Sequence, residues 1–430
     1  MKGWPDYRVS IARHPLFMCG FRPFFVLTAA SATLFMAAWL AALAGWPPGL
    51  SAWRVPGGLS VWHAHELMFG FSMASVAGFL LTAVPEFTGT APISRRALAA
   101  LVLLWLAARA AYLCASWWPA PLGVWPAALC NLGMSAVLLA QVGPPVWRDP
   151  ERRHIGFAWA LGALGGLQAG FFASLALGGD AMAWLHAAAG AFMILIVIAG
   201  SRVSMSVVNG YIEAGRPGAA PAGEAVYLAR PPRRYLAIFA MAVCSAVEFA
   251  LGADVVTGWT ALAAAAAMFN LLNDWHIGRA LFTRWALMLY ASYWLIALGY
   301  AAMGAAWLGA PMAPSAGRHL LMAGAMALAI FTVMSLAGRI HAGQWLDRRG
   351  WVPVAAAALV AAALLRALAG LWSAAGWAPL LVLASGVLWS AAFGAYLWHA
   401  WPVLTGPRSD GLDGCAEPAE KSAAPHSEPC

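Results

Sequence analysis

Twelve long apolar runs, separated by short polar segments, dominate this 430-residue chain. Each run approaches the roughly 20 residues that an α-helix needs to cross about 30 Å of hydrocarbon. The chain is 62% hydrophobic and 10% charged, whereas a soluble domain is about half apolar and a quarter charged. We therefore expect an all-α polytopic membrane protein with about twelve transmembrane helices in a lipid bilayer. The runs cover residues 23–46, 61–84, 94–115, 121–146, 154–178, 182–207, 234–253, 255–273, 285–308, 317–338, 351–373 and 377–402.

Breaks in the apolar pattern predict how the chain is divided. The shortest break is Gly252-Ala253-Asp254, which alone separates the seventh and eighth runs. A Gly/Pro-rich stretch reads as a loop between two halves, and the polar, small-residue-rich C-terminus reads as a disordered cytoplasmic tail. The predicted divisions are one membrane domain at 1–404, halves at 1–208 and 234–404, a connecting loop at 209–233 and a tail at 405–430.

The basic residues predict the direction of insertion. The net charge is +8, and 20 of the 25 basic residues fall on one side of the twelve runs, with two on the other. Basic residues concentrate in cytoplasmic loops, so both termini are predicted to be cytoplasmic. The positive net charge is thus explained by topology, and nucleic acid is not expected as a partner.

The sequence also excludes several kinds of chemistry. None of the six cysteines forms a C-x-x-C motif, so covalent c-type haem attachment is not expected. Two cysteines lie in the polar tail and the rest lie in or beside apolar runs, so a disulfide framework is not expected either. No phosphate-binding loop, dinucleotide fingerprint, nucleophile elbow or zinc-protease motif is present. Any activity therefore has to come from side chains inside or beside the membrane helices.

Histidines recur at the outer ends of the second, sixth and tenth runs. His63 and His65 begin the second run, His186 the sixth and His319 the tenth. Ionisable groups inside membranes tend to mark pathways, relays or ligand sites, and neutral imidazole ligates both metals and haem iron. The regular spacing predicts a metal or haem site on the outer side, and is consistent with a weak threefold repeat of four-helix units.

The stretch H63-A-H-E66 carries three ionisable side chains in four residues. At 100° per residue, His63 and Glu66 are about 60° apart, whereas His63 and His65 are about 160° apart. The two histidines therefore cannot clamp one ligand from a regular helix. Either one is a ligand while the other packs, or they serve different sites. Glu66 could orient His63, or it could be an interfacial acid.

Other polar residues leave more than one interpretation open. Arg109 and Arg366 lie toward the outer thirds of their runs, where they could neutralise haem propionates or form an internal ion pair, for example with Glu248. His341 lies about 33 Å along the helix from His319, and therefore on the cytoplasmic side. With His276 and His399 it could form a second site or a proton relay, although interfacial packing is the simpler interpretation.

Several motifs along nearly the whole chain resemble the NnrS family. The most specific is W62-H-A-H-E-L-M-F-G-F71 with A77-G-F-L-L-T-A-V-P85. The supporting motifs are G20-F-R-P-F-F25, T88-G89, G200-S-R-V203 with N209, H341-A-G343 and P407-R-S-D-G411. The chain departs from the family pattern at Glu86, at Phe87 and in S204-M-S-V-V208.

The resemblance implies a bacterial inner-membrane protein that holds haem b and copper. It also implies a role in nitric oxide metabolism, denitrification or protection against nitrosative stress, with an electron donor that is unknown. On that basis we expect His65 and His319 as axial haem ligands and His63 and His186 as copper or second-haem ligands. Arg109 and Arg366 would face propionates, and Glu66, Arg202 and His341 are supporting candidates.

Two other functions fit the same residues. Twelve spans with a long central loop are typical of a transporter for a small ion or metal complex, but the ionisable cluster lies at one face instead of the midplane. An accessory or sensor protein could bind metal without turnover. Sequence does not separate these from an enzyme that reduces nitric oxide, because all three need the same ligands.

Overall fold

The computed structural model describes residues 14–46, 53–118, 122–214 and 227–415. Within these ranges it contains twelve helical segments long and apolar enough to cross a membrane, which confirms the all-α polytopic prediction. The helices are α2 (Phe21–Leu43), α3 (Leu59–His65), α4 (Met73–Thr88), α5 (Arg95–Leu113), α6 (Trp125–Arg148), α7 (Ile155–Leu177), α8 (Ala181–Ala214), α9 (Pro231–Leu251), α10 (Val255–Leu272), α11 (Arg284–Trp307), α12 (Pro314–His319), α13 (Ala327–Ile340), α14 (Trp351–Leu368) and α15 (Ala378–Thr405).

Local sequence explains the helix ends. Gly252 has a φ of 66° and ends α9, a conformation that glycine adopts without steric cost. Two residues later, the Asp254 side chain accepts a hydrogen bond from the Val256 amide at 2.8 Å and caps α10. The short break therefore does separate two helices, as the sequence predicts.

Two spans are interrupted by π-helical segments. The second span consists of α3, the π segment η3 (Glu66–Ser72) and α4, and the tenth consists of α12, the π segment η7 (Leu320–Met326) and α13. Each π segment begins directly after a histidine, His65 or His319. The regular 100° spacing used for the sequence prediction therefore does not continue beyond these histidines, and π segments are frequent at functional sites.

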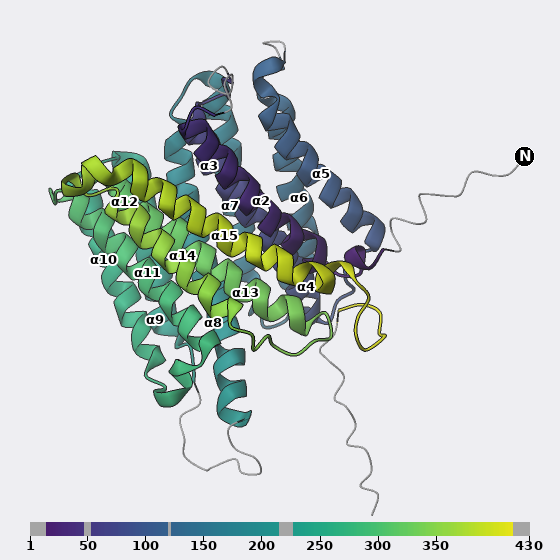
Figure 1. The fold of residues 1–430 in the computed structure, drawn as a ribbon. Helices are drawn as coiled ribbons and strands as arrows, with labels where there is room; N and C mark the ends of the chain where they lie inside the picture. Colours follow the sequence, from purple (N-terminus) through teal and green to yellow (C-terminus); the bar gives the residue numbers. More distant parts are fainter. Residues whose placement is uncertain (1–13, 47–52, 119–121, 215–226, 416–430) are drawn as a thin grey trace, which may run out of the picture.

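The same two spans form the centre of the bundle. In their most apolar windows, 83% and 78% of the residues are buried, against 17–61% in the other spans. Figure 1 shows α5, α6 and α7 toward one end and α9 to α12 toward the other, while α15 lies along α2. The first and last helices are therefore neighbours, and His65 of the second span lies in the interior.

Two boundaries differ from the sequence prediction. The helix α8 continues to Ala214, well into the predicted loop, and α9 already begins at Pro231; the remaining loop residues 215–226 lie outside the described part. Segment 406–415, expected to belong to a disordered tail, packs on the helix ends near His341, opposite the His319 end of the tenth span. There Arg408 NH1 donates to the His341 carbonyl at 2.9 Å. Residues 416–430 lie outside the described part.

A disulfide also joins the two ends of the chain. Cys19 lies just before α2 and Cys415 follows α15, and their Cα atoms are 5.7 Å apart. This pairing was not expected from the sequence, because the two cysteines are separated by 396 positions. Only the packing of α15 along α2 brings them together.

Candidate functional site

His63, His319 and Arg366 lie together at one end of the central spans. Arg366 on α14 is an electrostatic neighbour of both imidazoles, and His63 is an electrostatic neighbour of His319. The His63 ring stacks on Trp39 of α2, with ring centroids 4.2 Å apart. Arg366 makes no hydrogen bond or ion pair with any described residue. The group therefore combines two histidines with one uncompensated cation.

The ring of His319 is oriented by its own helix. Its Nδ1 lies 2.7 Å from the Ser315 carbonyl oxygen. Because a carbonyl only accepts, Nδ1 must donate, and Nε2 of the neutral ring then carries the lone pair. In this tautomer, the Nε2 lone pair is available to ligate a metal. The Nδ1 of His63 is buried and has no hydrogen-bond partner within the described ranges.

His65 points to a different side of the second span and enters an aromatic cage. Its ring stacks on Phe171 with centroids 4.7 Å apart. The other rings around it are Phe69, Tyr112 and Phe172. Its Nδ1 is 3.0 Å from Glu66 Oε1, and its Nε2 is buried without a partner in the described structure. The opposite placement of the two histidines agrees with the helix geometry of H63-A-H-E66.

Glu66 orients His65 and not His63, which differs from the sequence-based expectation. The reason is Arg109 on α5, whose NH1 donates to the same Oε1 at 2.9 Å. Both partners are nearly inaccessible: Glu66 is 1% and Arg109 is 8% exposed. Because the buried cation lies on the His65 side, the carboxylate turns there. A negative charge on Glu66 then holds the His65 proton on Nδ1 and leaves Nε2 open.

A chain of amide side chains extends this arrangement deeper into the bundle. Arg109 NH2 donates to the Asn131 amide oxygen, which also accepts from Gln168 Nε2 at 3.2 Å. Ser135 Oγ donates to Gln168 Oε1 at 3.0 Å. These hydrogen bonds connect α5, α6 and α7. They hold the Arg109 guanidinium in place, and the guanidinium in turn holds the Glu66 carboxylate. Sequence reasoning missed Asn131 and Gln168, although amides inside apolar runs often mark hydrogen bonds between helices.

His186 belongs to a separate group. Its Nδ1 is 3.4 Å from Glu248 Oε1, and Arg318 NH2 pairs with the same oxygen. The Arg318 guanidinium also lies over the Trp307 ring, 5.5 Å from its centroid. Glu248 therefore pairs with Arg318, not with Arg109 or Arg366.

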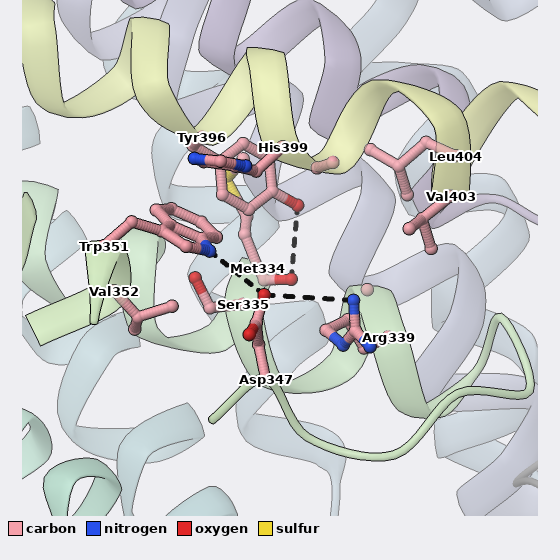
Figure 2. A pocket seen from close by; sticks show the side chains of 12 residues that line it. Met334, Ser335, Arg339, Asp347, Trp351, Val352, Tyr396, His399, Val403 and Leu404 are labelled. Atoms are coloured by element: carbon pink, nitrogen blue, oxygen red, sulfur yellow. Dashed lines mark hydrogen bonds and ion pairs between the residues drawn. The ribbon is translucent and has the colours of Figure 1, made fainter. Parts of the chain in front are cut away.

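The inner-side candidates lie far from these groups along their helices. Arg202 NH2 donates to the Arg153 carbonyl at 3.2 Å, and His341 Nε2 is 3.6 Å from Glu86 Oε2. A small cavity of about 20 Å³ lies near this face. Figure 2 shows Trp351 and Arg339 directed at Asp347 beside it, with His399 nearby. The Arg349 guanidinium beside Asp347 holds the pKa of that carboxyl well below its usual range.

The donor sets fit haem better than copper. In the described ranges, no three His, Cys, Asp or Glu side chains gather closely enough to hold a metal ion. Haem iron needs only one or two protein ligands, and His319 and His63 offer two imidazoles beside Arg366. Both terminal nitrogens of Arg109 are already occupied, so Arg366 is the better placed of the two arginines to face a propionate.

Together, these features define a multi-pass helical membrane protein with one buried and two partly buried histidines, His65, His63 and His319, near one end of its two central spans. The model of the NnrS protein family matches residues 15–408. The chain therefore belongs to the NnrS family, as its motifs suggest. Comparison with curated proteins finds no match.

Proposed function

We propose that this protein holds b-type haem at its outer-side histidines and binds nitric oxide there, in a bacterial inner membrane. Membership in the NnrS family supports the connection with nitric oxide. When bound, haem supplies an iron centre that takes nitric oxide as a ligand. Its electron donor, and whether binding leads to reduction, are not part of the proposal.

The grouping of His319 with His63 and Arg366 carries the proposal. His319 Nδ1 donates to a backbone carbonyl 2.7 Å away, which leaves Nε2 as the free donor atom. Arg366 has no anionic partner among the described residues, so a buried carboxylate would meet a matching cation. We therefore assign the haem to His319 and His63, whereas the sequence favoured His319 with His65.

His65 is proposed as a second, separate ligand position. Its open Nε2 and the carboxylate on its Nδ1 are the arrangement found at many metal-ligating histidines. Its electrostatic neighbours within the described part are Glu66 and Arg109, not another histidine. A ligand at this position would therefore be held apart from the His319 group. Copper at His63 and His186 gains no comparable support, because His186 already faces Glu248.

The optical spectrum of the purified protein tests the proposal. After haem-supplemented growth and extraction in mild detergent, we expect a b-type spectrum that shifts when nitric oxide is added to the reduced form. His319→Ala and His63→Ala should each lose most of the haem, measured as pyridine haemochrome per protein. His399→Ala is the matched control: this histidine stacks on Trp351 at the inner side, and its variant should keep the haem.

Two results would contradict this assignment. A full haem complement in His319→Ala would remove the proposed ligand. Wild-type protein that is well folded but contains neither haem nor copper by metal analysis would leave the histidines with structural or proton-handling roles. That outcome would favour the transporter interpretation.

A further inference from the structure

A cavity of about 70 Å³ lies in the middle of the bundle, between the second, sixth, ninth and tenth spans. It is separate from the histidine groups, and none of the contacts described above uses it. Its walls come from α4, α8, α11 and α13, together with the last residue of each π segment, Ser72 and Met326.

The cavity has a buried deep wall and an open side. Six of its lining residues are at most 3% exposed. They are Ser72, Leu80, Phe192, Leu289, Tyr293 and Met326. Five others are partly exposed, namely Val76, Phe79, Ile196, Ala199 and Val333. A guest held against the deep wall has to be small enough to fit between packed side chains.

Most of the lining is apolar, and two of its four hydroxyl groups donate to backbone carbonyls of their own helical segments. Ser72 Oγ donates to the Leu67 carbonyl at 2.9 Å and contacts Met326 Sδ at 3.0 Å. Ser292 Oγ donates to the Met288 carbonyl at 3.0 Å. In the described structure, only the Tyr293 hydroxyl is left in this wall as a buried donor without a partner.

This lining argues against water as the occupant. A buried water needs two to four polar partners, whereas apolar cavities stay dry and accept apolar guests. A cavity of about 150 Å³ is known to hold benzene, so a space of about 70 Å³ is too small for an aromatic ring. Its size and polarity fit a monatomic or diatomic apolar gas, and the Tyr293 hydroxyl can donate one weak hydrogen bond to a diatomic.

The π segments place the cavity directly below the histidines. η3 begins after His65 and ends at Ser72, and η7 begins after His319 and ends at Met326. The ends of the two segments contact each other through Ser72 and Met326 at the cavity wall. A guest in the cavity is thus one short helical segment deeper in the membrane than the histidine groups.

We propose that this cavity is a holding site for a small apolar gas on its way to the histidine groups. The identity of the gas as nitric oxide rests on the proposed function. The existence of the site does not, because it follows from the size and the apolar lining of the cavity.

Xenon is a suitable probe because it is apolar, monatomic and independent of haem. On the full-length protein in detergent, we expect saturable xenon binding by ¹²⁹Xe NMR, with xenon located in the cavity in xenon-pressurised crystals. Ala329→Val and Ala199→Val add carbon atoms to the lining and should weaken xenon binding at least tenfold. Ala337→Val adds the same atoms on the same helix as Ala329 but outside the lining, and should bind xenon like the wild type.

A variant that enlarges the cavity keeps the test informative if a filled variant folds poorly. Ile330 lines the cavity, and Ile330→Ala should bind xenon severalfold more tightly. Absence of xenon from both the wild type and Ile330→Ala would overturn the site. A detergent or lipid chain in the cavity, or unchanged xenon binding in Ala329→Val, would overturn it as well.

The cavity proposal and the haem assignment can be tested independently. Xenon binding in haem-free protein would support the cavity even if the haem assignment failed. In haem-loaded protein, Ala329→Val should keep its haem content but change the slow phase of nitric oxide rebinding after a light flash. Unchanged rebinding would overturn the assignment of the gas as nitric oxide.

Discussion

Two groups in this protein each combine one histidine, one carboxylate and one arginine. His65, Glu66 and Arg109 form one such group, and His186, Glu248 and Arg318 form the other. In each group a single carboxylate oxygen lies close to both the histidine and the arginine. An isolated carboxylate would be costly inside a membrane, and the arginine supplies the partner that it needs.

The group around Glu66 predicts a large loss of stability when its arginine is removed. Arg109→Ala leaves a charged or newly protonated Glu66 in an apolar site, and should cost about 3–5 kcal/mol. The free energy of unfolding can be measured by titration with a denaturing detergent. Arg148→Ala, at the exposed end of α6, should change it by less than about 0.5 kcal/mol. Adding Glu66→Gln to Arg109→Ala should recover part of the loss, and no recovery would contradict the ion-pair explanation.

Asp347 predicts a pH-dependent contribution at the inner side. Its carboxylate accepts from Arg349 Nε at 3.0 Å and from Trp351 Nε1 at 3.0 Å, and its pKa is lowered, first by the hydrogen bonds from Arg349. A lowered pKa stabilises the folded state above the unfolded pKa of about 3.9. Asp347→Asn should therefore cost about 2 kcal/mol at pH 7.

The sign of the pH effect provides the check. As the pH falls below about 4, the unfolded wild type binds a proton that the folded state resists, so the wild type loses its advantage over Asp347→Asn. Unfolding of both proteins is compared at pH 7 and pH 3.5. Asp413→Asn is the control, because its pair with Arg95 is largely exposed and worth at most about 1 kcal/mol. A difference that grows toward low pH would contradict the role of Asp347.

Among the helices, the closest approach that positions a candidate ligand is between α11 and α12. A Cβ added to Gly317 would meet the Gly299 carbonyl oxygen and would lie 2.7 Å from the Met303 amide nitrogen. Backbone atoms cannot yield as a flexible side chain can. Because His319 follows two residues later, this contact sets where its ring lies relative to α11.

Gly317→Ala is therefore expected to destabilise the protein by about 2 kcal/mol through overpacking, and to lower haem content together with stability. Gly162 on α7 is the matched control, since an added Cβ there meets no atom within 4 Å. Gly162→Ala should be neutral or stabilising by up to about 1 kcal/mol. Equal stability of the two variants, measured by the same unfolding titration, would show that α11 and α12 are not packed as described.

For the whole molecule, the distribution of basic residues predicts that the two chain ends face the cytoplasm. Fluorescent-protein fusions to residue 430 should fluoresce, and alkaline phosphatase fusions at the same position should be inactive, because the latter folds only outside the cytoplasm. A fusion in the loop between α5 and α6 should give the opposite pair of results. An active phosphatase at the C-terminus would reverse the predicted topology.

The disulfide between Cys19 and Cys415 gives an independent test of the same topology. In a reducing cytoplasm both residues would be thiols, although their positions allow a bond. After acid quench of the cells, denaturation and return to neutral pH without reductant, maleimide should then label both cysteines, with Cys19→Ser and Cys415→Ser each removing one labelled site. A bond that persists in cells would place this face in an oxidising compartment.

The sequence by itself determined the architecture of this protein. Run lengths and the scarcity of charge require membrane-spanning helices, since only a helix of that length satisfies its backbone in hydrocarbon. Even the break at Gly252-Ala253-Asp254 follows from local sequence, because Gly252 ends one helix and the Asp254 side chain caps the next. The motif around H63-A-H-E66 likewise predicted the NnrS family and that its two histidines face different sides.

The tertiary structure alone decided which side chains act together. Glu66 turns to His65 because Arg109 on another helix pairs with it, and His63 is an electrostatic neighbour of His319 although the two belong to different spans. Neither fact is encoded in spacing along one helix, and the π segments change that spacing in any case. The cavity and the pairing of Cys19 with Cys415 also depend on which helices pack together. Such contacts are properties of the assembled bundle, because each side chain's partner is supplied by a distant part of the chain.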